Sequence, residues 1–220
     1  MKHSIKMLLW TMGITVFLSS CDGVMDGLYD HSEESSKSEY GFVSKSNGSS
    51  IGQVCVNASM YDKWIYINFH ACKIDSALIG VTAEPEEWDI ALHRYDVKTN
   101  GASVIETGYA DLSQFVLSGS LPMGSYTEDI YTTNKVISDM SGMMQGHLVY
   151  AKTYYNSVLS CWMNVDTSTM PPVYRMSGKV YVVKLADGTY VALLLKSYMN
   201  DSSAKGYMRF DYVYPVKFNK

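Results

Sequence analysis

The C-terminal part of the chain alternates apolar and polar residues with a period of two, which is typical of β-strands with one buried face. The alternation is cleanest at residues 207–214, which read YMRFDYVY. Two further strand-like runs, residues 179–185 and 190–197, flank the sequence ADGT, which predicts a tight turn between them. A chain with this pattern is constrained to build β-sheet from consecutive paired strands.

Three more runs alternate in the same way and are predicted strands: residues 53–58, 64–69 and 88–97. The last of these runs leads to Asn100-Gly101, a dipeptide typical of hairpin turns. The eighteen tyrosines fit this pattern, because aromatic side chains suit the pleated surface of a sheet.

Helical periodicity is weak along the whole chain, and only residues 148–162 fit a short helix. We therefore predict an all-β or β-dominated domain at residues 51–220, with long loops between residues 110 and 176. No internal repeat of solenoid or propeller period is present.

The first twenty residues have the form of a secretory signal segment. Lys2 and Lys6 precede an apolar run that is too short and too early for a transmembrane helix. The segment ends in the sequence LSSC at residues 18–21, which resembles the lipobox of bacterial lipoproteins. This resemblance implies cleavage before Cys21, lipidation of Cys21 and anchoring in a membrane through several acyl chains. The alternative is an ordinary secretory signal with a chance cysteine.

Residues 21–50 are predicted to be the acylated cysteine followed by a flexible tether, because this stretch is rich in Ser, Gly and charged residues. The acidic residues soon after Cys21 resemble the surface-export signal of Bacteroidetes lipoproteins. In enterobacteria, an Asp beside the lipidated Cys would indicate inner-membrane retention instead. We favour the outer-membrane cell surface, with release in a soluble form left open.

Removal of residues 1–20 discards two Lys and no acidic residue, so the mature chain has 16 Lys+Arg against 22 Asp+Glu and a net charge of −6. This charge argues against nucleic acid as a partner. Beyond Cys21, three cysteines remain, and their spacing resembles no zinc site. A disulfide between Cys55 and Cys72 and free thiols at both positions are equally compatible with the sequence.

No catalytic constellation is visible in the sequence. It contains no G-x-S-x-G elbow, no Cys-His pairing in a known context, no phosphate-binding Gly loop and no EF-hand. The acidic run Glu84, Glu86, Glu87 and Asp89 is best explained as a solvated loop that enters the strand at Trp88. We therefore predict that the protein is not an enzyme.

Methionine is concentrated in one part of the chain. Of the eleven methionines after the predicted cleavage site, six fall within 37 residues: Met140, Met143, Met144, Met163, Met170 and Met176. Two pieces of this stretch, MSGMM and STMPP, combine Met with the Gly, Ser, Thr and Pro of loops. A loop thioether is idle, packed as apolar filler, or a soft metal ligand.

The sequence WDIALHRYDVKTNG at residues 88–101 resembles the signature of the HmuY-like family of Bacteroidetes haem-binding lipoproteins. Further matches follow in the expected order: KWIY at 63–66, MPPVY at 170–174, KVYVVKL at 179–185 and GYMRFDY at 206–212. The resemblance implies a hand-shaped antiparallel β fold with long ligand-binding loops. It also implies a haemophore, which takes haem (iron protoporphyrin IX) from host haem-carrying proteins and delivers it to a TonB-dependent outer-membrane receptor.

Two histidines hold the iron in the best-known relative, whereas this chain has methionines in both matching regions. The resemblance therefore implies Met143 and Met170 as axial ligands of the haem iron. The alternatives are Met144 and Met140 for the first position, Met176 for the second, and His147 as the main rival. A thioether is a soft donor, so this pair predicts a preference for ferrous iron.

Lys135, Lys152 and Arg175 lie near the methionines in sequence and are candidate partners for the haem propionates. The alternative function is a non-enzymatic adhesin or glycan-binding lipoprotein on the same scaffold. In that case the methionines are packed, and loop aromatic residues stack on sugars.

Overall fold

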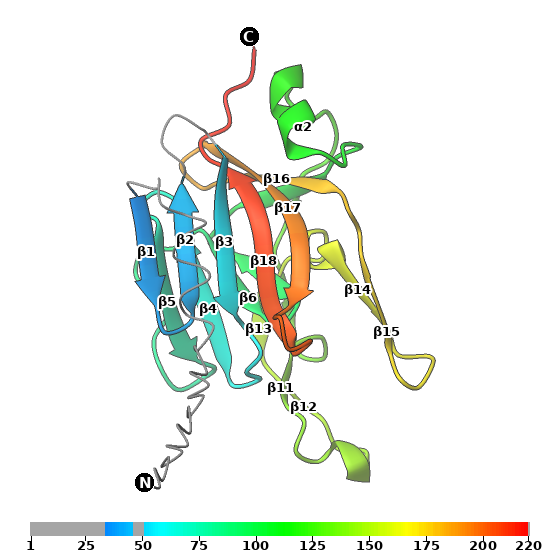
Figure 1. The fold of residues 1–220 in the computed structure, drawn as a ribbon. Helices are drawn as coiled ribbons and strands as arrows, with labels where there is room; N and C mark the ends of the chain where they lie inside the picture. Colours follow the sequence, from blue (N-terminus) through cyan, green and yellow to red (C-terminus); the bar gives the residue numbers. More distant parts are fainter. Residues whose placement is uncertain (1–33, 46–50, 220) are drawn as a thin grey trace, which may run out of the picture. The chain divides into compact units, whose positions relative to one another are not determined.

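A computed structural model describes residues 34–45 and 51–219 (Figure 1). Strands dominate these residues and form two main antiparallel sheets and three two-stranded ladders. The prediction of an all-β fold is confirmed.

The larger sheet has eight strands in the order β1-β2-β3-β18-β17-β16-β8-β9. Its strands are β1 (Glu34–Ser38), β2 (Gly41–Lys45), β3 (Ile51–Asn57), β8 (Ser103–Glu106), β9 (Thr127–Glu128), β16 (Val180–Lys184), β17 (Tyr190–Met199) and β18 (Lys205–Val213). The smaller sheet has the order β5-β4-β6-β7. Its strands are β4 (Lys63–Asn68), β5 (Lys73–Leu78), β6 (Ile90–His93) and β7 (Asp96–Thr99).

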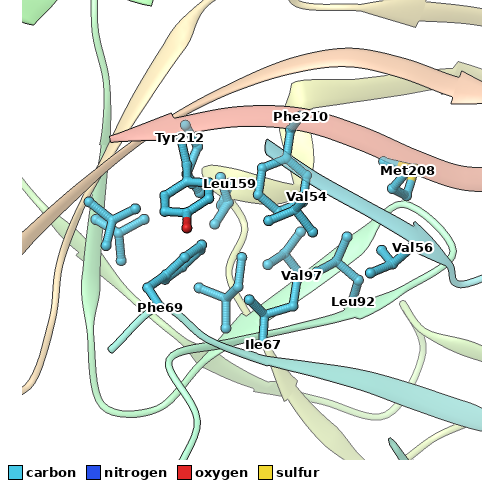
Figure 2. Packing of buried hydrophobic residues seen from close by; sticks show 14 of the residues in the cluster. Val54, Val56, Ile67, Phe69, Leu92, Val97, Leu159, Met208, Phe210 and Tyr212 are labelled. Carbon is cyan, nitrogen blue, oxygen red and sulfur yellow. The ribbon is translucent and has the colours of Figure 1, made fainter. Parts of the chain in front are cut away.

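The main core lies between these two sheets (Figure 2). Every second residue of β18 faces it, so that Met208, Phe210 and Tyr212 are fully buried. They belong to the same cluster as Ile67 and Leu92 of the smaller sheet. Each buried side chain of this size contributes about 1.5–3 kcal/mol by leaving water. The alternation in the sequence decides which side chains are buried, and their burial drives this packing.

The other face of the larger sheet carries a second, smaller core. Strand β16 serves both cores, because Tyr181 and Val183 join the main cluster while Val180 and Val182 join the second. Helix α2 (Leu112–Ser118) contributes Leu112 and Phe115 to this second core and lies at the end of the larger sheet near β16 and β17 (Figure 1). A strand buried on both faces needs a continuous apolar run, which explains why its sequence reads VYVV.

Five predicted strands are confirmed to within two residues, as β3, β4, β16, β17 and β18. The run at residues 88–97 is corrected, because it folds back on itself and forms both β6 and β7. Arg94 occupies the turn between them with φ of 55°. Asn100-Gly101 closes no hairpin; these residues lead from β7 in the smaller sheet to β8 in the larger one.

Contacts of Arg94 explain where this turn falls. Its guanidinium Nη1 donates to the backbone oxygen of Ser59 at 2.6 Å, and its guanidinium carbon Cζ lies 4.5 Å from the ring centre of Tyr61. Two oppositely charged residues of the signature, Asp89 and Arg94, thus have other partners. Asp89 accepts from the backbone N–H of Phe69 at 2.6 Å.

The tether prediction is wrong for residues 34–45, which form β1 and β2 and extend the larger sheet. Tertiary contact overrides the Ser-rich composition here, because β2 pairs along β3 and buries Val43 completely. Cys21 and the rest of the predicted tether lie outside the described residues.

The helix predicted at residues 148–162 is also wrong. This stretch contains β12 (Val149–Tyr150), β13 (Thr153–Tyr155) and the short 3₁₀ helix η2 (Leu159–Trp162). Helix α2 forms where a loop is predicted, and the side chain of Asp111 caps it by accepting from the N–H of Gln114. In the described part of the chain, no helix has both the length and the apolar composition of a membrane span.

The question of a disulfide is settled in favour of free thiols. Cys55, Cys72 and Cys161 are all unpaired, with Cys72 buried, Cys55 half-buried and Cys161 exposed. Burial raises the pKa of Cys55, which keeps this thiol protonated and unreactive at neutral pH.

His70 joins the two sheets through two carboxylates. Its Nε2 lies 3.0 Å from Oδ2 of Asp187, in the turn between β16 and β17, and its Nδ1 lies 3.3 Å from Oδ2 of Asp89. Burial lowers the pKa of His70, but the hydrogen bonds and charges of both aspartates outweigh it, and the net pKa is raised. The hydrogen bond from His70, with those from Thr189, lowers the pKa of Asp187 to about 2.

A His70→Gln variant is expected to lose stability mainly at acidic pH. The raised pKa of His70 stabilises the fold fully below its ordinary value of 6.5, and the lowered pKa of Asp187 does so above 3.8. The side chains of His70 and Asp187 are 43% and 46% exposed. Solvent screening therefore limits the loss in the free energy of unfolding at pH 5 to about 1 kcal/mol. Urea unfolding at pH 5 and pH 9 measures it, and an equal loss at both values would contradict this assignment.

Candidate functional site

Two hairpin arms leave the sheets between β9 and β16 (Figure 1). We call residues 130–155 the first arm and residues 163–176 the second arm. The first arm contains two ladders, β10 (Ile130–Thr132) with β13, and β11 (Ile137–Asp139) with β12. The second arm is one ladder, β14 (Met163–Asp166) with β15 (Val173–Met176).

The segment between the arms is anchored in the main core. Leu159 and Trp162 of η2 are fully buried. The indole Nε1 of Trp162 donates to the backbone oxygen of Tyr95 at 2.9 Å, and its ring lies 5.4 Å from that of Phe210. Both arms therefore start from a fixed base, although their outer parts project away from the sheets.

A fully buried amide, Asn156, organises this base. Its Nδ2 donates to the backbone oxygen of Thr127 and to Oδ1 of Asp129, both at 3.0 Å. Its Oδ1 accepts from the backbone N–H groups of Val158 and Leu159 at 3.2 and 2.9 Å. One side chain thus ties the two ends of the first arm to the start of η2.

Asp129 extends this network to the smaller sheet. It accepts from the backbone N–H of Thr99 at 2.6 Å and from the Thr99 hydroxyl at 2.9 Å. Burial raises the pKa of Asp129, while the bonds from Thr99 and Asn156 act in the opposite direction. The hydrogen-bond donors around Asp129 thus offset part of the cost of burying its charged carboxylate.

The tip of the first arm is a folded turn rather than the extended loop that its sequence suggests. Asp139 ends β11 and accepts from the N–H and hydroxyl of Ser141 at 2.7 and 3.0 Å, which lowers the pKa of Asp139. A 3₁₀ helix, η1 (Met143–Gln145), follows. Gly146 closes it with φ of 76°, a left-handed conformation that favours glycine.

The tip of the second arm begins in the same way. Asp166 ends β14, and its Oδ1 accepts from the hydroxyl and the N–H of Ser168 at 2.6 and 3.0 Å. These two hydrogen bonds lower the pKa of Asp166. Met170 follows two residues later, before Pro171.

The two tips share one sequence, D-x-S-x-M, at residues 139–143 and 166–170. In both arms the Asp is the last residue of the outgoing strand and caps the turn through the Ser. Met143 and Met170 therefore stand at equivalent positions, four residues beyond their capping aspartates. This repeat is present in the sequence, but only the strand ends at Asp139 and Asp166 show that its two copies occupy equivalent places in the two arms.

Exposure separates the tip methionines from those that serve as core filler. Met143, Met144 and Met170 are 46%, 86% and 85% exposed, whereas Met163 is 5% exposed. Met176 lies opposite Met163 at the base of the second arm, about 10 Å along the strand from the tip end of the ladder. The packing explanation therefore fits Met163 but not the three tip methionines.

The remaining candidates lie along the arms. His147 is exposed beside the first tip, and its backbone N–H donates to the backbone oxygen of Gly142 at 2.9 Å. Lys135 and Lys152 lie next to a backbone hydrogen bond that joins the two sides of the first arm, and Arg175 lies on β15. All three cations are exposed.

Exposed apolar side chains gather on the same arms. Of the sixteen large hydrophobic residues that are exposed in the described ranges, ten lie between residues 130 and 176. Tyr131 and Tyr154 face each other across β10 and β13 with ring centres 5.4 Å apart, and both are more than half exposed. Such a surface suits an apolar ligand that enters between projecting elements.

A separate open cleft of about 470 Å³ lies near β5 and the loop at residues 83–87. Its lining is polar and includes Asp75, Glu86 and Glu87, and none of its lining residues belongs to either arm. Within residues 34–45 and 51–219, no three His, Cys, Asp or Glu side chains lie close enough to hold a metal ion.

Known proteins share both the fold and the sequence of this chain. A HmuY-like haem-binding candidate of Bacteroides vulgatus is 49% identical, with a TM-score of 0.77 over 82% of this chain and 100% of the other. A candidate lipoprotein of Bacteroides fragilis is 46% identical, with a TM-score of 0.78 over 83% and 100%. The apo HmuY analogue of Tannerella forsythia is 24% identical, with a TM-score of 0.62 over 82% and 96%, and shows likeness of fold alone.

No curated protein matches the chain. The model of the HmuY protein family matches residues 60–212, which include the whole smaller sheet, the strands of the larger sheet from β8 onward, both arms and the sequence at residues 88–101. This match covers well over half of the 220 residues. The chain therefore belongs to the HmuY family.

Proposed function

We propose that this protein is a non-enzymatic, lipid-anchored haem-binding protein of the outer-membrane surface, and that Met143 and Met170 hold the haem iron from its two sides. Family membership and the haem-binding description of a relative at 49% identity support the choice of ligand. The observation that carries the choice of residues is the D-x-S-x-M sequence, which ends each arm in an exposed methionine at the same position.

The chemistry of the thioether fits this role. Met is a haem ligand in other proteins, where it raises the reduction potential of the iron, and as a soft donor it favours the ferrous state. The arms also supply the other surfaces that haem requires. Exposed apolar and tyrosine side chains suit the porphyrin face, and Lys135, Lys152 and Arg175 supply positive charge for the propionates.

Met143 is preferred over its neighbours for two reasons. Successive residues of a 3₁₀ helix point about 120° apart, so Met143 and Met144 of η1 cannot both point toward one haem held between the two arms. Met140 directly follows the capping aspartate and has no counterpart in the second arm, where threonine occupies that position. The proposal extends to delivery of haem to a TonB-dependent receptor, with haem drawn from host haem-carrying proteins.

Titration of the purified protein with haem, in the presence and absence of dithionite, tests this function. We expect a shifted Soret band with one haem per chain, and tighter binding after reduction. The absence of any Soret shift in both oxidation states, together with retention on a glycan array, would instead support the adhesin.

A further inference from the structure

We propose that the tip of the first arm is a second binding site, for a monovalent soft metal ion of the Cu(I) type, held by the thioethers of Met140, Met143 and Met144. This site shares Met143 with the proposed haem site but uses neither Met170 nor the second arm, so it can hold its metal whether or not the protein binds haem. Its basis is the concentration of sulfur in the sequence MSGMM, combined with the way in which the backbone folds this sequence.

The backbone brings the three methionines together. The N–H of Met143 donates to the oxygen of Met140 at 3.0 Å, and Gly142 between them has φ of −88° and ψ of 9°. These are the features of a type I turn, which places its first and fourth Cα atoms within about 7 Å. Met144 follows directly in η1, so the backbone places all three methionines within five consecutive residues of one folded tip.

Further hydrogen bonds hold this turn closed. The oxygen of Gly142 accepts from the N–H of Gln145 at 3.0 Å and from the N–H of His147 at 2.9 Å. The space beside Gly142 is filled by His147, whose Cβ would lie 3.0 Å from a Cβ at position 142. A glycine is therefore needed for this close approach, which also brings the His147 residue beside the methionines.

The type of donor selects the metal. Thioethers are soft, uncharged ligands that favour Cu(I), and an imidazole accepts the same ion. Hard cations such as Ca²⁺ and Mg²⁺ need several oxygen ligands, which these side chains do not supply. Met143 and Met144 are 46% and 86% exposed, so an ion from solvent can reach these two side chains.

The test is an anaerobic titration of the purified protein with Cu(I) against the chromophoric chelator bicinchoninate, with Ag(I) as a redox-inert second probe. We expect the wild type to take one equivalent of Cu(I). A Met140→Leu/Met144→Leu double variant keeps the apolar volume but removes two donors, so its Cu(I) affinity should fall by at least about tenfold. A Met170→Leu variant is the matched control and should bind Cu(I) like the wild type.

Haem titration separates this proposal from the haem-binding function. The Met140→Leu/Met144→Leu variant should bind haem normally, whereas the Met170→Leu variant should bind it poorly. A wild type that withdraws no Cu(I) from the chelator, or a double variant that withdraws as much as the wild type, would overturn the copper site without affecting haem. An equal loss of Cu(I) affinity in Met170→Leu would also overturn it, because the metal would then lie between the arms.

Discussion

Replacement of Met143 or Met170 by Ala is expected to weaken the binding of ferrous haem by at least about tenfold in each case, which corresponds to about 1.4 kcal/mol or more. Each substitution removes one bond to the iron while leaving the fold intact, because both side chains project into solvent from the ends of their arms. The double variant should show no low-spin ferrous spectrum at all, since neither axial position has a protein ligand.

Two control variants make this result specific. Met144→Ala removes a neighbouring thioether from the same tip, and Met123→Ala removes one that is 93% exposed and belongs to neither arm. Both should bind ferrous haem like the wild type. Equal affinities for the wild type, Met143→Ala and Met170→Ala would refute the assignment of ligands, and a selective loss in Met144→Ala would move the first ligand by one residue.

Asn156→Ala is expected to have the largest effect on stability, with a loss of about 2–4 kcal/mol in the free energy of unfolding. The substitution leaves the part-buried oxygen of Thr127 and the buried N–H of Leu159 without the partners that Asn156 provides. It also removes one of the donors that stabilise the half-buried carboxylate of Asp129. Unsatisfied buried groups cost more than the hydrogen bonds themselves contribute.

Urea unfolding of Asn156→Ala beside Asn164→Ala measures this effect. Asn164 is exposed on β14, so its replacement should change the free energy of unfolding by no more than about 0.5 kcal/mol. Haem affinity should fall only in Asn156→Ala, because this variant loosens the base on which both arms stand. A loss of stability below about 1 kcal/mol in Asn156→Ala would show that the network does not organise this base.

The sheets could be predicted from the sequence because their strands are long and half-buried. In β18 the buried residues Met208, Phe210 and Tyr212 alternate with less buried ones, and this alternation is the signal that burial on one face imposes. In β6 and β7 the signal fails because all four residues of β6 are buried. Because β6 is buried at every position, including the polar His93, its sequence has no alternation that reveals where the chain reverses.

The arms could not be predicted, because their ladders contain only two to four residues and have no period to detect. Their conformation depends on the long-range contacts of Asn156 and Trp162 with the body of the protein. The methionines themselves stand out in the sequence, and their concentration predicts a functional stretch. What the sequence alone does not supply is the equivalence of Met143 and Met170, which rests on the strand ends at Asp139 and Asp166.

The most direct test of ligation by two thioethers is the reduction potential of the bound haem, measured by spectroelectrochemistry in the wild type and in a Met143→His/Met170→His variant. Thioether ligands stabilise ferrous iron, whereas imidazole ligands favour the ferric state more. We predict a clearly more positive potential in the wild type than in the double His variant. Equal potentials in the two proteins would contradict the claim that these two methionines hold the iron.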